Sequence, residues 1–289
     1  MKRPLPLAEG LLLLPAAVIL FGLFLAPLFA VFFDTLGDLS SPDLAGYARL
    51  VADPQVQRGF LFTLEYALAS TVLSFLCGTL LAAAFQVPFF GRSWMRIASL
   101  VPVIVPGLVA SFAVLALFER GGVLYRVLEL LNIPFPRIVR EPNGVGIVLA
   151  LAWKESPMMG IVIGSALAAV PGDTVKAART LGAGAAQAFF RIQVPQAAPG
   201  IAAAMILGLA RGLGAYAIPN LLGPAYPKPV TSLLYEALEY GNLQRAYALC
   251  ILLACLSGTI AAAYGKWFGP SAADQAGKRT WRPGRRHGA

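Results

Sequence analysis

The sequence has 289 residues, of which 58% are hydrophobic and only 13% are charged, and its mean hydropathy is +0.71. So little polar surface cannot cover a soluble core of this size, which excludes an ordinary soluble protein and indicates a protein of the lipid bilayer. The net charge of +9 does not indicate nucleic-acid binding, because the basic residues flank apolar segments instead of gathering on one amphipathic element.

Six segments are long and apolar enough to cross roughly 30 Å of hydrocarbon, which takes about 20 residues. Their approximate bounds are 11–33, 60–86, 97–118, 145–170, 197–222 and 245–268. The first is too long for the apolar region of a secretory signal and ends without a small-residue cleavage site, so we interpret it as a retained span. The sequence therefore predicts an all-α membrane protein with six transmembrane helices.

Basic residues in the connections predict sidedness, since short cytoplasmic loops are enriched in Lys and Arg. The N-terminus, the second and fourth connections and the tail 269–289 are basic, whereas the first and last connections are acidic. Both termini are therefore expected in the cytoplasm, and the tail is expected to be disordered and attracted to anionic lipid. The external loop 119–143 opposes the pattern with Arg120, Arg126, Arg137 and Arg140.

Within that loop, residues 123–131 place apolar side chains on one face at helical spacing before Asn132 and Pro134 end the run. We expect a short helix along the outer membrane surface. Packing against the rest of the protein is the favoured explanation, and contact with an external partner protein is the alternative.

Side chains that support catalysis or metal binding are scarce. Cys77, Cys250 and Cys255 fall in apolar runs without a CxxC or metal-site spacing, which favours small buried hydrophobic residues. The single histidine, His287, lies in the basic tail, which excludes most histidine-based schemes. We expect no catalytic residues, no metal site and no cofactor in this chain.

A polar insert at 171–195 separates the fourth and fifth spans on the predicted cytoplasmic side. Pro171 breaks the fourth span, and Asp173 or Thr174 is expected to cap a short helix by accepting hydrogen bonds from its free amides. An apolar strip follows at i, i+3 and i+6, formed by Val175, Ala178 and Leu181.

Gly182 to Gly184 then permits a turn and close approach of another backbone. In the second short helix Phe189 and Ile192 recur at i, i+3, and Pro195 opens the fifth span, where the missing amide proton costs little. The insert therefore predicts a helix, a glycine turn and a second helix that form a docking surface.

The spacing of this insert resembles the EAA loop of inner-membrane permease subunits of binding-protein-dependent ABC importers. That pattern is Glu-Ala-Ala, three residues, Gly, nine residues, Ile, one residue, Leu-Pro. The matching positions are Ala177, Ala178, Gly182, Ile192 and Pro195, with Val194 a conservative match. Lys176 stands where the family has Glu and reverses a charge.

The resemblance implies that this loop, including Asp173, Lys176 and Phe189, enters a groove of a cytoplasmic ATPase and transmits closure of the ATPase dimer to the spans. In the family the Glu carboxylate contacts a basic residue of the ATPase, which Lys176 cannot do. Three alternatives are open: the contact is absent, Asp173 replaces it, or an acidic residue of the ATPase groove pairs with Lys176. The chain has no GxxxxGK[ST] phosphate loop. ATP and Mg²⁺ are therefore expected on the partner ATPase, and this chain is expected to be no enzyme.

Ionisable residues inside spans are costly and usually face a cavity or a partner. Glu65 lies near the outer end of the second span, Lys154 and Glu155 within the fourth, and Arg211 near the middle of the fifth. Neighbouring residues diverge by about 100° on a helix, so Lys154 and Glu155 cannot pair with each other. Solute contact and a structural network both remain open, and Glu65 has the alternative of a headgroup-level position.

Prolines are expected to interrupt the third, fourth and fifth spans and to free carbonyls that line a cavity; they are Pro102, Pro106, Pro157, Pro199 and Pro219. Residues 214–223 resemble the fifth-span end of permeases of the spermidine and putrescine branch. Tyr216 and Asn220 share a helix face and are candidates to line or gate the path. Interfacial anchoring is the alternative for Tyr216.

A polyamine would use carboxylates and aromatic faces, which Glu65, Glu155 and Tyr216 supply. Arg211 favours an anionic solute instead, and related permeases serve ferric iron, sulfate and phosphonates. The resemblance implies a bacterial inner-membrane subunit that pairs with a second, related permease, an ATPase dimer and an external solute-binding protein. Two alternatives are disfavoured. An ion-coupled transporter usually has an internal inverted repeat, and this sequence shows none. An intramembrane enzyme would carry a His-Glu or paired-Asp motif, which this sequence also does not show.

Overall fold

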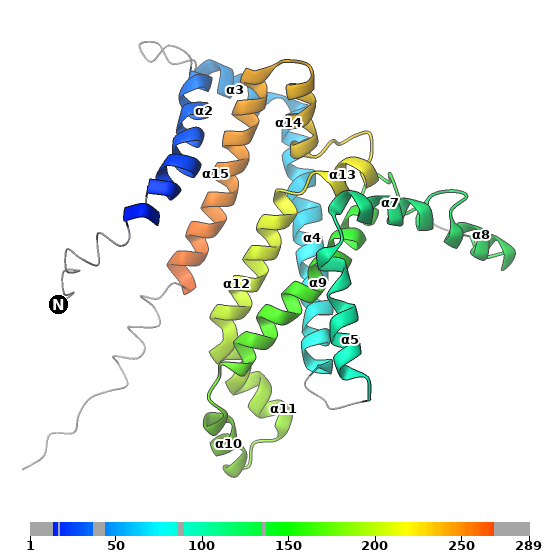
Figure 1. Ribbon diagram of the computed structural model, residues 1–289, viewed down its shortest axis with the longest axis vertical. Helices are drawn as coiled ribbons and strands as arrows, with labels where there is room; N and C mark the ends of the chain where they lie inside the picture. The colour runs from blue at the N-terminus through cyan, green and yellow to red at the C-terminus, as the bar shows by residue number, and fades with distance from the viewer. Residues whose placement is uncertain (1–13, 17, 37–43, 86–89, 135–136, 269–289) are drawn as a thin grey trace, which may run out of the picture.

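The computed structural model describes residues 14–16, 18–36, 44–85, 90–134 and 137–268, and within these residues every regular element is a helix (Figure 1). Six helices are long and apolar enough to cross a membrane, namely Leu14–Thr35, Pro54–Ala84, Gly107–Leu130, Val145–Ala168, Ala185–Leu213 and Leu243–Lys266. The prediction of an all-α chain with six spanning helices is confirmed. The predicted tail 269–289 lies outside the described residues, and the side on which each terminus lies stays a prediction.

The helices form a bundle around α4 (Pro54–Ala84) and α9 (Val145–Ala168), with α12 (Val194–Leu213) packed against both. The helix α15 (Leu243–Phe268) lies beside α12 and carries α2 (Ala26–Leu36), which follows the π-helix η1 (Leu20–Leu25). The short helices α3 (Leu44–Ala52) and α14 (Val230–Glu239) lie at one end, and α13 (Ala217–Leu222) packs beside α7 (Gly107–Phe118) below them (Figure 1).

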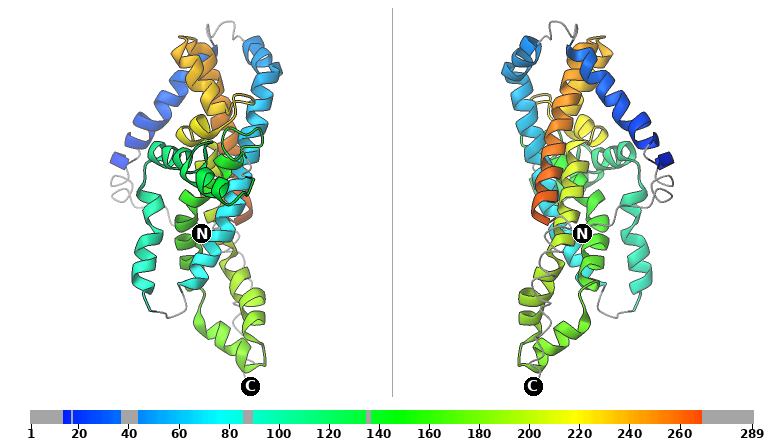
Figure 2. Two further views of the ribbon diagram at one scale, coloured as in Figure 1. Left: turned by 90° about the vertical axis from the view of Figure 1, so that its right-hand side faces the viewer. Right: turned by 90° about the vertical axis from the view of Figure 1, so that its left-hand side faces the viewer.

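At the other end α10 (Gly172–Thr180) and α11 (Ala185–Ala188) project beyond the bundle, and we call this the coupling end (Figures 1 and 2). The π-helix η2 (Phe189–Gln193) leads from α11 into α12. The second connection is followed by α5 (Arg92–Ser99), which stands apart from α4 and α9 in the side views (Figure 2).

Glycines let the central helices touch backbone to backbone. A Cβ atom on Gly78 of α4 would lie 2.8 Å from both the carbonyl oxygen of Ser156 and the amide nitrogen of Gly160 on α9. On α12, a Cβ on Gly212 would lie 3.2 Å from the Cβ of Ala67. Membrane helices gain packing contacts in this way, because lipid provides no hydrophobic force between them.

Three apolar clusters fill the bundle. One joins α4, α7, α9, α12 and α13 around Phe62, Ile147 and Leu213. A second joins α9 and α12 near the coupling end, around Ile163 and Leu167. A third packs α4 against α14 and α15 at the opposite end. The first two clusters hold α9 in the centre of the bundle and so fix the positions of its ionisable residues.

The third predicted span, 97–118, is not one helix. The short helix α6 (Val101–Ile104) ends before Val105, which is extended at φ −63° and ψ 124°, and α7 begins at Gly107. Pro106 causes the break, because proline lacks an amide proton and disfavours a helical residue before it. The expected break is therefore found in this span.

The other prolines behave differently. The fifth span is broken at 214–216, and Pro219 lies in the separate helix α13. Pro157 and Pro199 lie inside continuous helices, so the prediction that they interrupt α9 and α12 is wrong. Packed neighbours let a membrane helix accommodate proline without ending.

A helix is present where it was expected, as α8 (Val123–Leu130), and its position on the outer membrane surface stays a prediction. Its side chains Val123, Val127 and Leu130 are exposed, with Leu130 at 84%. Leu124 and Leu128 are half-buried where α8 contacts α7, so packing within this chain explains part of the apolar face and leaves the rest exposed.

Candidate coupling loop and translocation pathway

The segment 171–195 folds as α10, a turn, α11 and η2, and it projects from the bundle at the coupling end (Figure 1). Gly182 forms the turn at φ 92°, a backbone conformation that glycine adopts without the clash of a Cβ atom. No described atom would lie within 4 Å of a Cβ at this position. The space beside the turn is open for a partner.

The start of α10 differs from the prediction. The residue before the helix is Pro171, no side chain caps it, and the amide of Thr174 donates to the carbonyl of Pro171. The prediction that Asp173 or Thr174 caps this helix is wrong, because Gly172 already lies inside the first turn. In this first turn the negative charge of Asp173 interacts favourably with the positive end of the helix dipole.

Lys176 forms an ion pair with Asp173 on the same helix, with 3.3 Å between its Nζ and the Oδ1 of Asp173. Both side chains are highly exposed, at 80% and 95%, so the pair contributes little to stability. Both charges remain accessible to a docking protein. Ala177 is also exposed, and Ala178 is half-buried beneath it.

The second half of the loop is anchored in the bundle. Ala188 is buried, and Phe189 and Val194 pack on the cluster around Ile163 and Leu167. The side-chain amide of Gln193 donates to the carbonyl of Leu167 at 3.2 Å, which joins the end of the loop to α9. Ile192 is half-buried, and Pro195 occupies the first turn of α12.

Two apolar side chains of the loop point away from the bundle. Leu181 is 88% exposed and Phe190 is 66% exposed, and the ring of Phe190 meets that of Phe189 edge-on. Leu181 belongs to the predicted apolar strip, but Phe190 was not singled out from the sequence. Its position next to Phe189, which recurs with Ile192 at i, i+3, was the available signal.

Lys154 reaches from α9 to the break in the third span. Its Nζ donates to the carbonyl oxygen of Val105 at 2.6 Å and to those of Pro102 and Val103, each at 3.3 Å. These carbonyls lack helical partners because the chain stops being helical at Val105. The ammonium group therefore acts as a C-cap for α6, which is a structural role.

Glu155 points to α12. Its Oε2 lies 3.2 Å from the Nε of Arg211, with the carboxylate side chain 12% exposed and the guanidinium side chain 39% exposed. The cavity beside the pair measures only about 10 Å³. As predicted, Lys154 and Glu155 do not pair with each other, and the two adjacent residues join α9 to two different spans.

Glu65 lies on an exposed face of α4 with Leu61, Leu68 and Val72. No hydrogen bond or ion pair joins it to another residue in the described part of the chain. The structure does not bring it together with Glu155 or Arg211.

Tyr216 and Asn220 do come together. The side-chain amide of Asn220 donates to the hydroxyl of Tyr216 at 3.4 Å. The ring of Tyr216 stacks on that of Tyr235 with centroids 3.9 Å apart. Tyr216 and Asn220 line a cavity of about 420 Å³, which is also bounded by Arg140, Lys228, Glu236, Glu239 and Tyr240.

Most charges around this cavity are paired. Lys228 binds Glu236 at 2.8 Å, and Arg140 binds Glu119 at 3.3 Å. Glu239 has no ion pair among the described residues. Sequence reasoning missed Tyr235 and Lys228. The stacking of Tyr235 on Tyr216 depends on the path of α14, and Lys228 lies before α14 and pairs with Glu236 within it.

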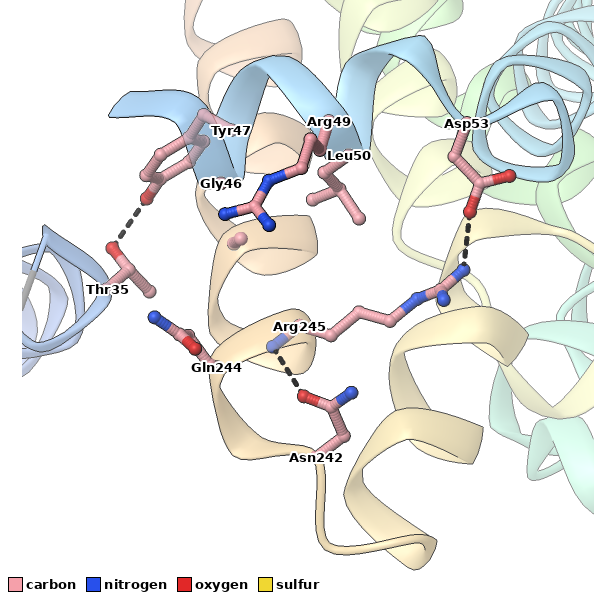
Figure 3. Close-up of a pocket in the computed structure, with 10 residues that line it drawn as sticks. Thr35, Gly46, Tyr47, Arg49, Leu50, Asp53, Asn242, Gln244 and Arg245 are labelled. Atoms are coloured by element: carbon pink, nitrogen blue, oxygen red, sulfur yellow. Dashed lines mark hydrogen bonds and ion pairs between the residues drawn. The ribbon is translucent and has the colours of Figure 1, made fainter. Parts of the chain in front are cut away.

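A second cavity near this end, of about 440 Å³, lies between α2, α3 and the start of α15 (Figure 3). Figure 3 shows Arg245 reaching Asp53, with 3.0 Å between its Nη2 and the Oδ2 of Asp53. The other oxygen of Asp53 accepts from the amide of Gln55 and caps α4. These polar contacts fasten the first connection to the last span.

A family model described as "Binding-protein-dependent transport system inner membrane component" matches residues 70–273. The molybdenum transport system permease protein ModB of Escherichia coli is 27% identical over 237 residues, 79% of this chain and 100% of its own length. The trehalose transport system permease protein SugA of Mycobacterium tuberculosis is 26% identical over 245 residues, 82% of this chain and 78% of its own.

Among solved structures, a chain of a bacterial alginate ABC transporter in complex with an alginate pentasaccharide-bound periplasmic protein superposes with a TM-score of 0.75. It is 18% identical, and the match covers 90% of this chain and 93% of that chain. A chain of the MetNI methionine ABC transporter in an inward-facing conformation gives a TM-score of 0.57 over 73% of this chain and 93% of its own. These likenesses show a shared fold.

Proposed function

Because the chain belongs to the family of binding-protein-dependent transport system inner membrane components, we propose that it forms half of the translocation pathway of an ABC importer. The observation that carries the proposal is the helix–turn–helix at 171–195. It projects from the bundle with Leu181 and Phe190 exposed, while Gln193 joins it to α9. A push on the loop is thereby transmitted to the spans.

The assembly follows from this role. A cytoplasmic ATPase dimer, which supplies ATP and Mg²⁺ chemistry, docks on the loop, and a solute-binding protein delivers solute at the opposite end. The alginate transporter whose structure contains a periplasmic protein supports that arrangement. We further propose a second, related permease as the other half, in a bacterial inner membrane with both termini in the cytoplasm.

For the solute, the charges along the candidate path favour a polar molecule without net charge. Lys154 is bound by carbonyl groups, and Arg211 by Glu155. Arg211 therefore no longer favours an anion. The stacked pair of Tyr216 and Tyr235 with nearby amide and carboxylate groups suits a polyhydroxylated ring, and the relative named as a trehalose permease agrees with this class.

A polyamine-type solute is the second candidate. Among the described residues Glu239 lines the cavity of Tyr216 without an ion pair, whereas Glu65 is exposed on α4 and does not line this cavity. The free carboxylate of Glu239 and the aromatic pair would attract a cation. Thermal stabilisation of the associated solute-binding protein by di- and trisaccharides, against spermidine and putrescine, separates the two candidates. Stabilisation by spermidine alone would refute the polyhydroxyl assignment.

The coupling role is tested by Gly182→Trp, which fills the open space at the turn. We expect normal membrane insertion, loss of ATPase docking and loss of transport into vesicles. Gly121→Trp is the matched control and should transport, because Gly121 also has a positive φ of 86° and no atom within 4 Å of its Cβ position but lies between α7 and α8. Normal transport by Gly182→Trp would refute the coupling role, and transport that follows an ion gradient without ATP would refute the importer assignment.

A further inference from the structure

A cavity of about 610 Å³ lies at the coupling end between the last turn of α4, α5 and one face of α9. Its size falls within the range of roughly 300–1,000 Å³ that is typical of small-ligand sites. Much of its wall is apolar or lacks side chains, and includes Leu81, Ala82, Leu100, Pro157, Gly160 and Ile161. Of the residues used in the proposed coupling and pathway roles, only Gln193 borders this cavity.

The polar and apolar faces of α5 are turned the opposite way to those of a surface helix on a soluble protein. Arg92, Arg96 and Ser99, which share one face at i, i+4 and i+7, line the cavity. Trp94 and Ile97 are 78% and 61% exposed. The helix therefore presents apolar side chains outward, as lipid requires, and directs its cations toward the cavity.

Both arginines are available to a ligand. In the described part of the chain neither the guanidinium of Arg92 nor that of Arg96 has a hydrogen bond or an ion pair, and the guanidinium of Arg96 lies 5.6 Å from the ring centroid of Phe85. Four residues of helix separate them by about 6 Å along the axis. Two guanidinium groups at this spacing match a phosphate, which arginine binds through paired N–H donors.

The depth of the site selects the source of that phosphate. Trp94 lies between the two arginines in sequence and on the exposed face, and tryptophan side chains concentrate at the level of lipid headgroups. A free anion would use the arginines but not the apolar wall. A phospholipid uses both, because its phosphate and its acyl chain meet polar and apolar surfaces in that order.

We propose that Arg92 and Arg96 bind the phosphate of an anionic phospholipid whose acyl chain lies along the apolar wall between α4, α5 and α9. Gln193, which joins the coupling loop to Leu167, lines the same cavity. The bound lipid therefore lies beside the junction through which the loop moves α9.

The test is native mass spectrometry of the complete transporter, delipidated in detergent and titrated with phosphatidylglycerol or with phosphatidylcholine of the same chain length. We expect one phosphatidylglycerol to bind at least tenfold more tightly than phosphatidylcholine. The double variant Arg92→Gln/Arg96→Gln should lose this preference. The control Arg58→Gln/Arg120→Gln removes the same charge from exposed positions outside the cavity and should keep it.

Equal preference in the wild type and the Arg92/Arg96 variant would overturn the proposal, as would equal loss in the control, which would show a net-charge effect. Ser165→Leu narrows the cavity from α9 and leaves the arginines intact, so it should weaken phosphatidylglycerol binding several-fold. Competition with inorganic phosphate tests the source of the phosphate group and needs no variant. Displacement of the lipid by millimolar phosphate from the wild-type protein would reveal a free-anion site and overturn the lipid assignment.

Discussion

Lys154→Met removes an ammonium group and keeps the length of the side chain. In the wild type the Nζ donates to the carbonyl of Val105 at 2.6 Å and to two further carbonyls at 3.3 Å. A hydrogen bond to a charged group contributes roughly 1.5–3 kcal/mol, and the two long bonds contribute less. Since Lys154 is half-buried, we expect a total loss of about 2–3 kcal/mol in the free energy of unfolding.

Equilibrium unfolding in mixed micelles with sodium dodecyl sulfate, followed by far-ultraviolet circular dichroism, measures this loss. Lys176→Met makes the same chemical change at an exposed helix position and should alter stability by no more than about 0.5 kcal/mol. Lys154→Arg keeps a charged donor and should recover part of the loss. If Lys154→Met were as stable as Lys176→Met, the C-cap role of this lysine would be wrong.

Three further predictions concern contacts that hold the helices of the bundle together. Glu155→Gln and Arg211→Gln should show a coupling energy of about 1 kcal/mol in a double-mutant cycle, and additive effects would refute their pairing. Gly78→Leu should abolish a monodisperse gel-filtration peak, because its Cβ meets backbone at 2.8 Å, whereas Gly258→Leu should not. Asp53→Ala, which removes both the cap of α4 and the ion pair with Arg245, should lower the free energy of unfolding by about 1–2 kcal/mol. Asp53→Asn should be more stable than Asp53→Ala, and equal losses would exclude the capping role.

Long-range packing decided what the sequence could predict of the fold. The number of spanning helices follows from apolar length alone, and the break before Pro106 follows from the chemistry of proline. Pro157 carries the same chemistry yet lies inside a continuous helix, where α9 packs closely on α4 through Gly160 and Gly78. Whether a proline ends a membrane helix depends on these neighbours, which a local pattern does not contain.

The candidate site was predictable to the same extent. The helical divergence of Lys154 and Glu155 correctly excluded a pair between them, because that argument needs only one helix. The partners of Lys154 are backbone carbonyls, which every residue has and no sequence pattern marks. The stacking of Tyr216 on Tyr235 likewise required the path of α14. Features within one helix were therefore accessible, and those between helices were not.

The fourth span also has a mechanical property that follows from where its two neighbouring charges lie. Leu167, which receives the bond from Gln193, is 13 residues beyond Lys154, or about 20 Å along the helix axis. Lys154 holds the third span and Glu155 the fifth at one level of the bilayer. A tilt of α9 that begins at the loop should therefore reach both neighbours at the same depth and at the same moment, so that the two walls move together and not in succession.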